Sequence, residues 1–245
     1  PSADMLEKRL AEVGESTGVM ADRIGDDLFQ VGHERDSWII DAANPRFTIF
    51  HTLAKSTTAD RFVFSQFVPK SPTFDLAWLS PDFLENFADD VTVEGWGARF
   101  SPLVDPAKID DPAFSTQKVR VELDARDSWS RYKRFKNSGD FHHLPLDVIR
   151  VRSRSQDALG RARITSRGKL TARGNSFVHY QRIATDVRDA YAAQIEGLEG
   201  RYRLGFPKHE NRVRMQGQPF WIEFKKPLTD LGALIARMFS GAEPF

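Results

Sequence analysis

The chain of 245 residues contains no cysteine. This absence excludes disulfide bonds, zinc sites built on thiolates and cysteine nucleophiles. No apolar run reaches the roughly 18 residues of a membrane-spanning helix. The opening residues, PSADMLEKRL, are polar and mixed in charge, unlike a signal peptide. We therefore expect a cytoplasmic protein that does not interact with a membrane.

Four motifs with well-understood chemistry are also missing from the sequence. There is no Gly-x-x-x-x-Gly-Lys-Ser/Thr, no Gly-x-Gly-x-x-Gly after a strand, no Gly-x-Ser-x-Gly and no His-Glu-x-x-His. These absences argue against P-loop ATP hydrolysis, Rossmann dinucleotide chemistry and α/β-hydrolase chemistry.

Charge is distributed unevenly along the chain, although the net charge is only +1. Residues 1–117 carry 10 Lys and Arg against 20 Asp and Glu, whereas residues 118–173 carry 15 against 6. The stretch 102–115, PLVDPAKIDDPAFS, is rich in proline and aspartate and lies at this change of sign. We predict an acidic half over 1–110, which could dock a protein partner, and a basic half over 116–245. The basic face could bind an anion, or the two halves could dock on each other.

Runs of strand-like sequence outnumber helical ones and are joined by short links. We predict two short helices within the first 31 residues, a helix capped by Ser80, a long helix over 180–198 and a final helix over 227–239. The predicted strands cover 46–53, 61–68, 91–100, 118–125, 147–154, two arms around a turn at Gly168, and 218–226. This order favours an α+β fold with antiparallel sheets and helices packed on one side, and it is compatible with two subdomains.

The basic residues fall in two clusters that suggest an anion-binding surface. The first cluster interleaves cations with aromatic rings over 128–137, and the second alternates along the strands and the hairpin over 147–173. Cationic side chains neutralise phosphates, and aromatic rings stack on unpaired bases. The predicted anion-binding residues are Trp129, Arg131, Tyr132, Lys133, Arg134, Lys136, Arg150, Arg152, Arg154, Arg161, Arg163, Arg167, Lys169 and Arg173.

The hairpin gives the strongest reason to expect binding rather than a merely solvated surface. Residues 158–174 contain no acid. Strand alternation would place Arg161 and Arg163 outward on one arm and Lys169 and Arg173 outward on the other. Like charges that face each other across a strand pair are destabilising, and an anionic ligand would relieve the repulsion. The alternative is a solvated outer face, with the aromatic residues of 128–137 turned into the core.

The leading functional hypothesis is therefore a non-catalytic protein that binds nucleic acid or another phosphorylated polyanion, with no cofactor and no metal. A second hypothesis is a metal-dependent nuclease or phosphodiesterase. Glu223 and Lys225 form the Glu-x-Lys half of such a site, but the usual upstream Pro-Asp is missing. A third hypothesis is a structural subunit of a larger assembly. His142 and His143 are adjacent, and neighbouring side chains on an extended segment point apart, which disfavours a metal site there.

Overall fold

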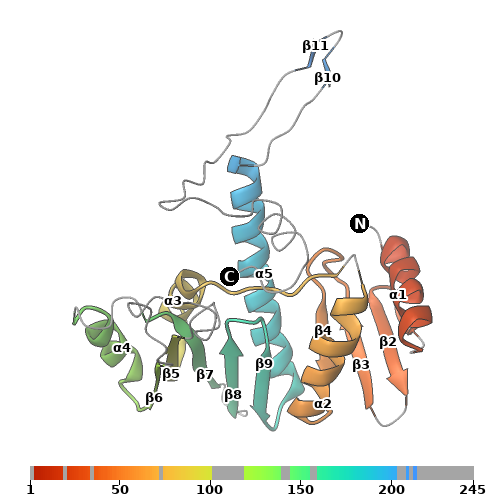
Figure 1. Ribbon diagram of the computed structural model, residues 1–245. Helices are drawn as coiled ribbons and strands as arrows, with labels where there is room; N and C mark the ends of the chain where they lie inside the picture. Colours follow the sequence, from red (N-terminus) through yellow and green to blue (C-terminus); the bar gives the residue numbers. More distant parts are fainter. Residues whose placement is uncertain are drawn as a thin grey trace, which may run out of the picture. The chain divides into compact units, whose positions relative to one another are not determined.

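The computed structural model describes residues 3–18, 21–33, 36–71, 74–100, 119–138, 144–154, 159–202, 208–209 and 212–213 (Figure 1). The chain divides into two units, Pro1–Arg188 and Asp189–Phe245. The first unit holds two antiparallel sheets. The second unit contains the end of helix α5 (Phe177–Tyr202) and a short hairpin of β10 (Lys208–His209) and β11 (Arg212–Val213).

Helix α1 (Ala3–Thr17) opens the chain because its apolar residues recur on one face. Leu6, Leu10 and Val13 are all buried, at spacings of four and three residues. Gly18 ends the helix with φ at 72°, and its N–H donates to the Gly14 carbonyl at 2.8 Å. The predicted second helix in this region is wrong, because the chain continues into strands.

Those strands form the first sheet, in the order β1-β2-β3-β4, with every neighbouring pair antiparallel. The apolar residues after Gly18 alternate along β2, so that Phe29 and Val31 are buried beneath α1 and pair with Ile40 and Trp38 of β3. The four strands are β1 (Ala21–Arg23), β2 (Leu28–His33), β3 (Asp36–Asp41) and β4 (Ile49–Thr52).

The predicted strand over 61–68 is also wrong, since residues 56–70 are helical. Residues 56–60, just before the predicted strand, form α2 (Ser56–Asp60), which is followed by the π-helix η1 (Arg61–Phe67) and the short η2 (Val68–Lys70). Phe62 and Phe67 are buried against the first sheet, and Phe62 stacks on Trp38 with ring centroids 3.8 Å apart. Phe62 and Phe67 are five residues apart, a spacing that suits the wide turn of a π-helix. Their packing against the first sheet overrides the strand propensity of aromatic residues.

The second sheet has five antiparallel strands in the order β6-β5-β7-β8-β9. The strands predicted over 91–100, 118–125 and 147–154 and in the two hairpin arms are confirmed, with small shifts in their ends. Their bounds are β5 (Thr92–Phe100), β6 (Val119–Asp124), β7 (Leu146–Arg154), β8 (Leu159–Thr165) and β9 (Leu170–Gly174).

Two helices cover one face of this sheet. Ser80 caps α3 (Pro81–Asp89) by accepting the Phe83 N–H at 3.1 Å, as predicted. Helix α4 (Ser128–Lys136) packs on β5 through Trp96, which is 2% exposed and whose Nε1–H donates to the Ser128 carbonyl at 2.9 Å. The opposite face of the sheet therefore remains for the basic side chains.

These elements confirm the predicted α+β fold with antiparallel sheets. Among the described helices, none has the length and apolarity needed to cross a membrane. The predicted linker over 102–115, the strand over 218–226 and the helix over 227–239 lie outside the described residues. The division into 1–110 and 116–245 stays a prediction.

Candidate anion-binding face

Strand register brings most of the predicted strand arginines onto one face of the second sheet. Arg150 pairs with Arg163, Arg152 pairs with Arg161, and Arg161 pairs in turn with Arg173. Residues directly opposite each other in neighbouring strands project from the same face. We call this surface of β7–β9 the arginine face. The predicted opposition of like charges is thus present in the fold.

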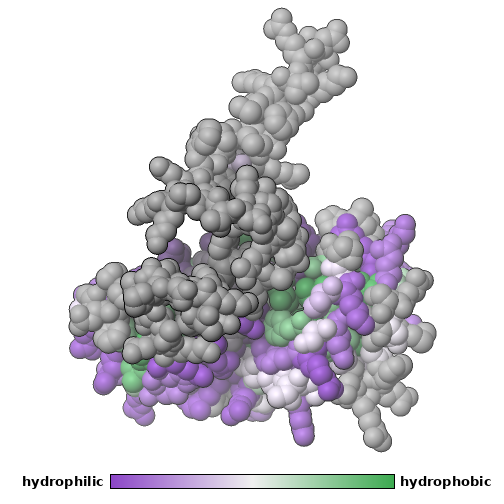
Figure 2. Space-filling view, viewed as in Figure 1, coloured by the Kyte–Doolittle hydropathy of each residue, from purple (hydrophilic) through white to green (hydrophobic). Residues whose placement is uncertain are grey.

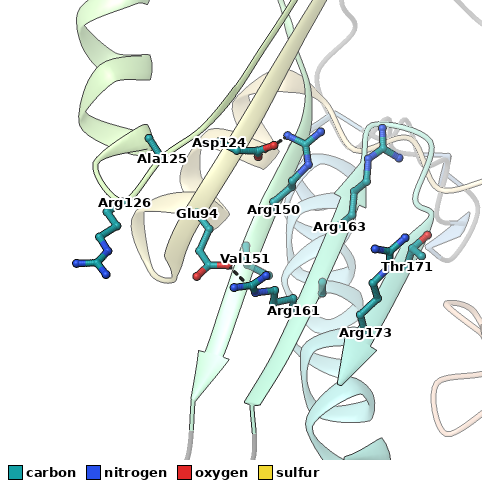
Figure 3. A pocket seen from close by; sticks show the side chains of 11 residues that line it. Glu94, Asp124, Ala125, Arg126, Arg150, Val151, Arg161, Arg163, Thr171 and Arg173 are labelled. Atoms are coloured by element: carbon teal, nitrogen blue, oxygen red, sulfur yellow. Dashed lines mark hydrogen bonds and ion pairs between the residues drawn. The ribbon is translucent and has the colours of Figure 1, made fainter. Parts of the chain in front are cut away.

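A pocket of about 590 Å³ opens on the arginine face (Figure 3). Five arginines and only two carboxylates line it, so its described wall is positively charged. Figure 2 shows that hydrophilic residues predominate over the described surface around β6–β8. We call this the arginine pocket; its lining residues are Glu94, Asp124, Ala125, Arg126, Arg150, Val151, Arg161, Ala162, Arg163, Thr171 and Arg173.

Two glycines of β5 let the carboxylates of β6 reach across to β7. A Cβ on Gly95 would lie 2.0 Å from Asp124 Oδ1, and one on Gly97 would lie 3.2 Å from Glu122 Cγ. Because both positions lack a side chain, Arg150 makes ion pairs of 2.9 Å with Asp124 and with Glu122. We call the part of β5 that lacks side chains at these two glycines the trough. Across it, Arg150 pairs with two carboxylates of β6.

A bulge in β5 supplies the second carboxylate of the pocket. The pairing of β5 with β7 shifts between Val93 and Gly95, which leaves Glu94 as the extra residue. Its carboxylate lies 2.7 Å from Arg152 Nε and 3.1 Å from Arg161 Nε. The Arg152 Nε–H is buried and not aligned for a hydrogen bond. This bulge determines where the carboxylate of Glu94 lies.

The carboxylate of Glu122 is ionised at neutral pH. A hydrogen bond from Arg120 is the main cause that lowers its pKa, and Arg150 lowers it further. Both arginines stabilise the charged form. Arg150 therefore faces a permanent negative charge, which limits what it can offer to a ligand.

Three arginines of the pocket have no such neutralising partner. Within the described part of the chain, Arg126, Arg163 and Arg173 make no hydrogen bond or ion pair. Arg163 is half-buried opposite Thr171, and the other two are exposed. These three guanidinium groups supply the uncompensated charge of the pocket.

The turn that carries Arg126 is fixed by backbone hydrogen bonds. The Ala125 N–H donates to the Glu94 carbonyl at 3.0 Å, and the Ser128 N–H donates to the Ala125 carbonyl at 3.1 Å. Arg126 is the pocket residue that sequence reasoning missed. Its position directly after a predicted strand was the available signal, but nothing in the sequence placed it near β7 and β8.

The predicted cluster over 128–137 is helix α4, and it does not line the pocket. Trp129 and Lys133 both bond to Asp89 of α3, at 2.8 and 2.6 Å. The hydrogen bond from Lys133 is the main cause that lowers the pKa of Asp89, followed by the one from Trp129. Trp129 also stacks on Tyr132, with ring centroids 4.9 Å apart.

The remaining α4 residues are engaged in a similar way. Lys136 makes an ion pair of 2.6 Å with Glu85, and the Tyr132 hydroxyl donates to the same carboxylate at 2.7 Å. Burial raises the pKa of Tyr132. Arg131 pairs with Asp127 at 2.8 Å, and the Arg134 Nε lies 3.5 Å from the Ser130 carbonyl. The anion-binding role predicted for α4 stays a prediction.

The tip of the predicted hairpin is built as expected, but its lysine faces another partner. Gly168 has φ at 69° and permits the turn. Lys169 bonds to Asp60 and Ser56 of α2 rather than projecting into the arginine pocket. Arg167 is exposed at the tip.

Several predicted residues lie outside what the structure describes. Glu223, Lys225, His142 and His143 are among them, as is the side chain of Arg154 at the end of β7. Among the described residues, no group of three or more His, Asp or Glu could hold a metal ion. The nuclease hypothesis is therefore untested.

Comparison with known proteins identifies the family of the chain. No curated protein matches the sequence, and no solved structure matches it either. One family model covers residues 13–245, and the chain therefore belongs to the family described as MJECL33-like protein.

Proposed function

We propose that this protein binds a phosphate-bearing polyanion, with nucleic acid as the leading candidate, through the arginine pocket. The observation that carries the proposal is the set of three arginines without a partner in the described structure, Arg126, Arg163 and Arg173. A guanidinium group presents its donors in a planar fork that matches phosphate oxygens. A charge of this kind left unpaired in a pocket is a ready contact for a phosphate.

The repulsion built into the arginine face supports the same proposal. Arg161 lies opposite Arg173, and Glu94, the carboxylate that pairs with Arg161, is shared with Arg152. A pair of like charges in this position destabilises a sheet by roughly 0.2–1 kcal/mol. A bound anion would relieve the repulsion, so binding and stability should be linked.

Location and protein partners belong to the proposal as well. The absence of cysteine is compatible with a reducing compartment such as the cytoplasm. The acid excess of residues 1–117 would suit a basic protein partner on the N-terminal half.

Binding should be measured by fluorescence anisotropy with a labelled single strand and a labelled duplex over a series of salt concentrations. We expect log Kd to change linearly with log salt. The triple variant Arg126→Gln, Arg163→Gln, Arg173→Gln should weaken binding at least about tenfold, and it should reduce the salt slope by roughly 2–3, since each lost phosphate contact removes about 0.9.

The matched control removes the same charge from α4. The variant Arg131→Gln, Lys133→Gln, Lys136→Gln also lowers the net charge by three, but it leaves the arginine pocket intact. We expect it to bind within about twofold to threefold of the wild type, because its cations are already neutralised. Equal losses in the two variants would show that only net charge matters, and absence of salt-dependent binding by the wild type would refute the proposed function.

A further inference from the structure

The three arginines without a partner among the described residues lie at two opposite ends of the arginine pocket. Figure 3 shows Arg126 on the side of α4, and Arg163 and Arg173 on the far side, on β8 and β9. Between them lie the ion pairs of Arg150 with Asp124 and of Arg161 with Glu94. The arginines without a described partner are therefore separated by a central region in which the charges are paired.

Sheet register gives the backbone distance across the pocket from β6 to β8. Asp124, Gly95, Arg150 and Arg163 are successive partners across β6, β5, β7 and β8. Three strand spacings separate the first from the last, which is about 14 Å at roughly 4.8 Å each. Arg126 follows Asp124 by two residues, in the turn beyond the end of β6.

A single phosphate group does not span this arrangement. Its oxygens accept hydrogen bonds from nitrogen atoms only about 2.7–2.9 Å away, and the guanidinium groups at the two ends point apart in Figure 3. The charges in the centre are already paired, so the centre adds little attraction for an anion placed there. Both ends are used together only when the ligand carries at least two separated anionic groups.

We infer that the ligand is a chain of phosphate groups that crosses the strands, with one phosphate held by Arg163 and Arg173 and another held by Arg126. This inference rests on the proposed function and adds the ligand class and its direction. None of the described residues that line the pocket is aromatic, so the described wall has no aromatic ring on which a base could stack. Recognition through phosphates alone does not depend on base identity.

A length series tests the inference on the full chain. Isothermal titration calorimetry should compare inorganic phosphate, oligothymidylates of increasing length, abasic oligonucleotides of the same lengths, and polyphosphate chains of matched charge. For the wild type we expect weak binding of the shortest ligands and a step of at least about tenfold in affinity once the chain spans both ends. Equal affinities of abasic and base-bearing strands are expected, and the polyphosphate arm distinguishes a general phosphate chain from a nucleic acid backbone.

Two single-end variants make the inference falsifiable. Arg126→Gln should abolish the step while leaving the affinity for the shortest ligands within twofold of the wild type. The variant Arg163→Gln, Arg173→Gln should weaken short and long ligands alike. If Arg126→Gln weakens every length equally, the three arginines converge on one group and the inference is wrong, although the proposed function stands. If no anion of any length binds the wild type, the proposed function fails first.

Discussion

Helix α4 and the arginine face have similar cationic sequences, but their cations have different partners in the fold. On α4, Lys133 and Lys136 each meet a carboxylate of the neighbouring helix α3, Asp89 and Glu85, at 2.6 Å. On the arginine face, Arg163 has no described partner, and other arginines share their carboxylates. The aromatic residues of α4 pack against Trp96 and against each other.

This difference shows that the density of basic residues in a sequence does not by itself predict how much unpaired charge a surface carries. What matters is the balance of charge after folding, because an exposed ion pair leaves little field for a ligand. The acids of α3 neutralise cations of α4, whereas only two carboxylates line the pocket beside its five arginines.

The largest expected effect comes from a substitution at Gly95, in the trough beneath Arg150. In Gly95→Ala, the new Cβ would lie 2.0 Å from Asp124 Oδ1 and 2.9 Å from the Leu123 carbonyl oxygen. We expect the free energy of unfolding to fall by about 1–3 kcal/mol, because backbone must shift as well as a side chain. Chemical denaturation followed by circular dichroism would measure it.

The matched control for this change is Gly25→Ala in the turn between β1 and β2. An added Cβ there meets nothing closer than Leu28 Cβ at 3.5 Å, which is an ordinary contact. Its stability should stay within about 0.5 kcal/mol of the wild type. Similar losses at Gly25 and Gly95 would contradict the account of the trough.

Removal of an acid from the arginine face should have a smaller effect. Glu94→Gln releases Arg152 and Arg161 from their shared carboxylate. We expect affinity for a labelled oligonucleotide to rise several-fold, with a salt slope steeper by roughly 1–2, because two more cations can contact phosphates. Unchanged or weaker binding would mean that these two arginines serve the sheet and not the ligand.

The smallest expected effect concerns the pH dependence of the α3–α4 pair. The hydrogen bond from Lys133 lowers the folded-state pKa of Asp89 below its ordinary value of 3.8. The stabilisation is therefore fully present above the unfolded-state pKa, and it is lost as pH falls through the folded-state pKa. Asp89→Asn should cost only a few tenths of a kcal/mol at neutral pH, because the pair is exposed.

The measurement that checks this is the free energy of unfolding between about pH 5 and pH 2. Asp89→Asn should show a shallower decline toward acid than the wild type. Parallel acid limbs in the two proteins would show that the Asp89 contacts contribute nothing to folding.

Much of the second sheet followed from local patterns in the sequence. The alternation of β6, the turn at Gly168 with its positive φ, and the Ser80 cap of α3 all rest on neighbouring residues. The π-helix over 61–67 did not follow, because aromatic residues suit a strand and a buried helix equally well. Its conformation depends on the contact between Phe62 and Trp38, which lie far apart in the chain.

Side chains alternate along any β-strand, so the sequence alone predicts that Arg150 and Arg152 share one face of a strand. The same alternation places Arg161 and Arg163 on one face of another strand. Which of these charges lie close enough to form ion pairs depends on the tertiary structure. The order β6-β5-β7 places β5 between two strands that follow it in the chain, and the bulge at Glu94 sets the local register. An ion pair depends on distance in space, and strand order and register are fixed by packing over the whole sheet rather than by neighbours in sequence.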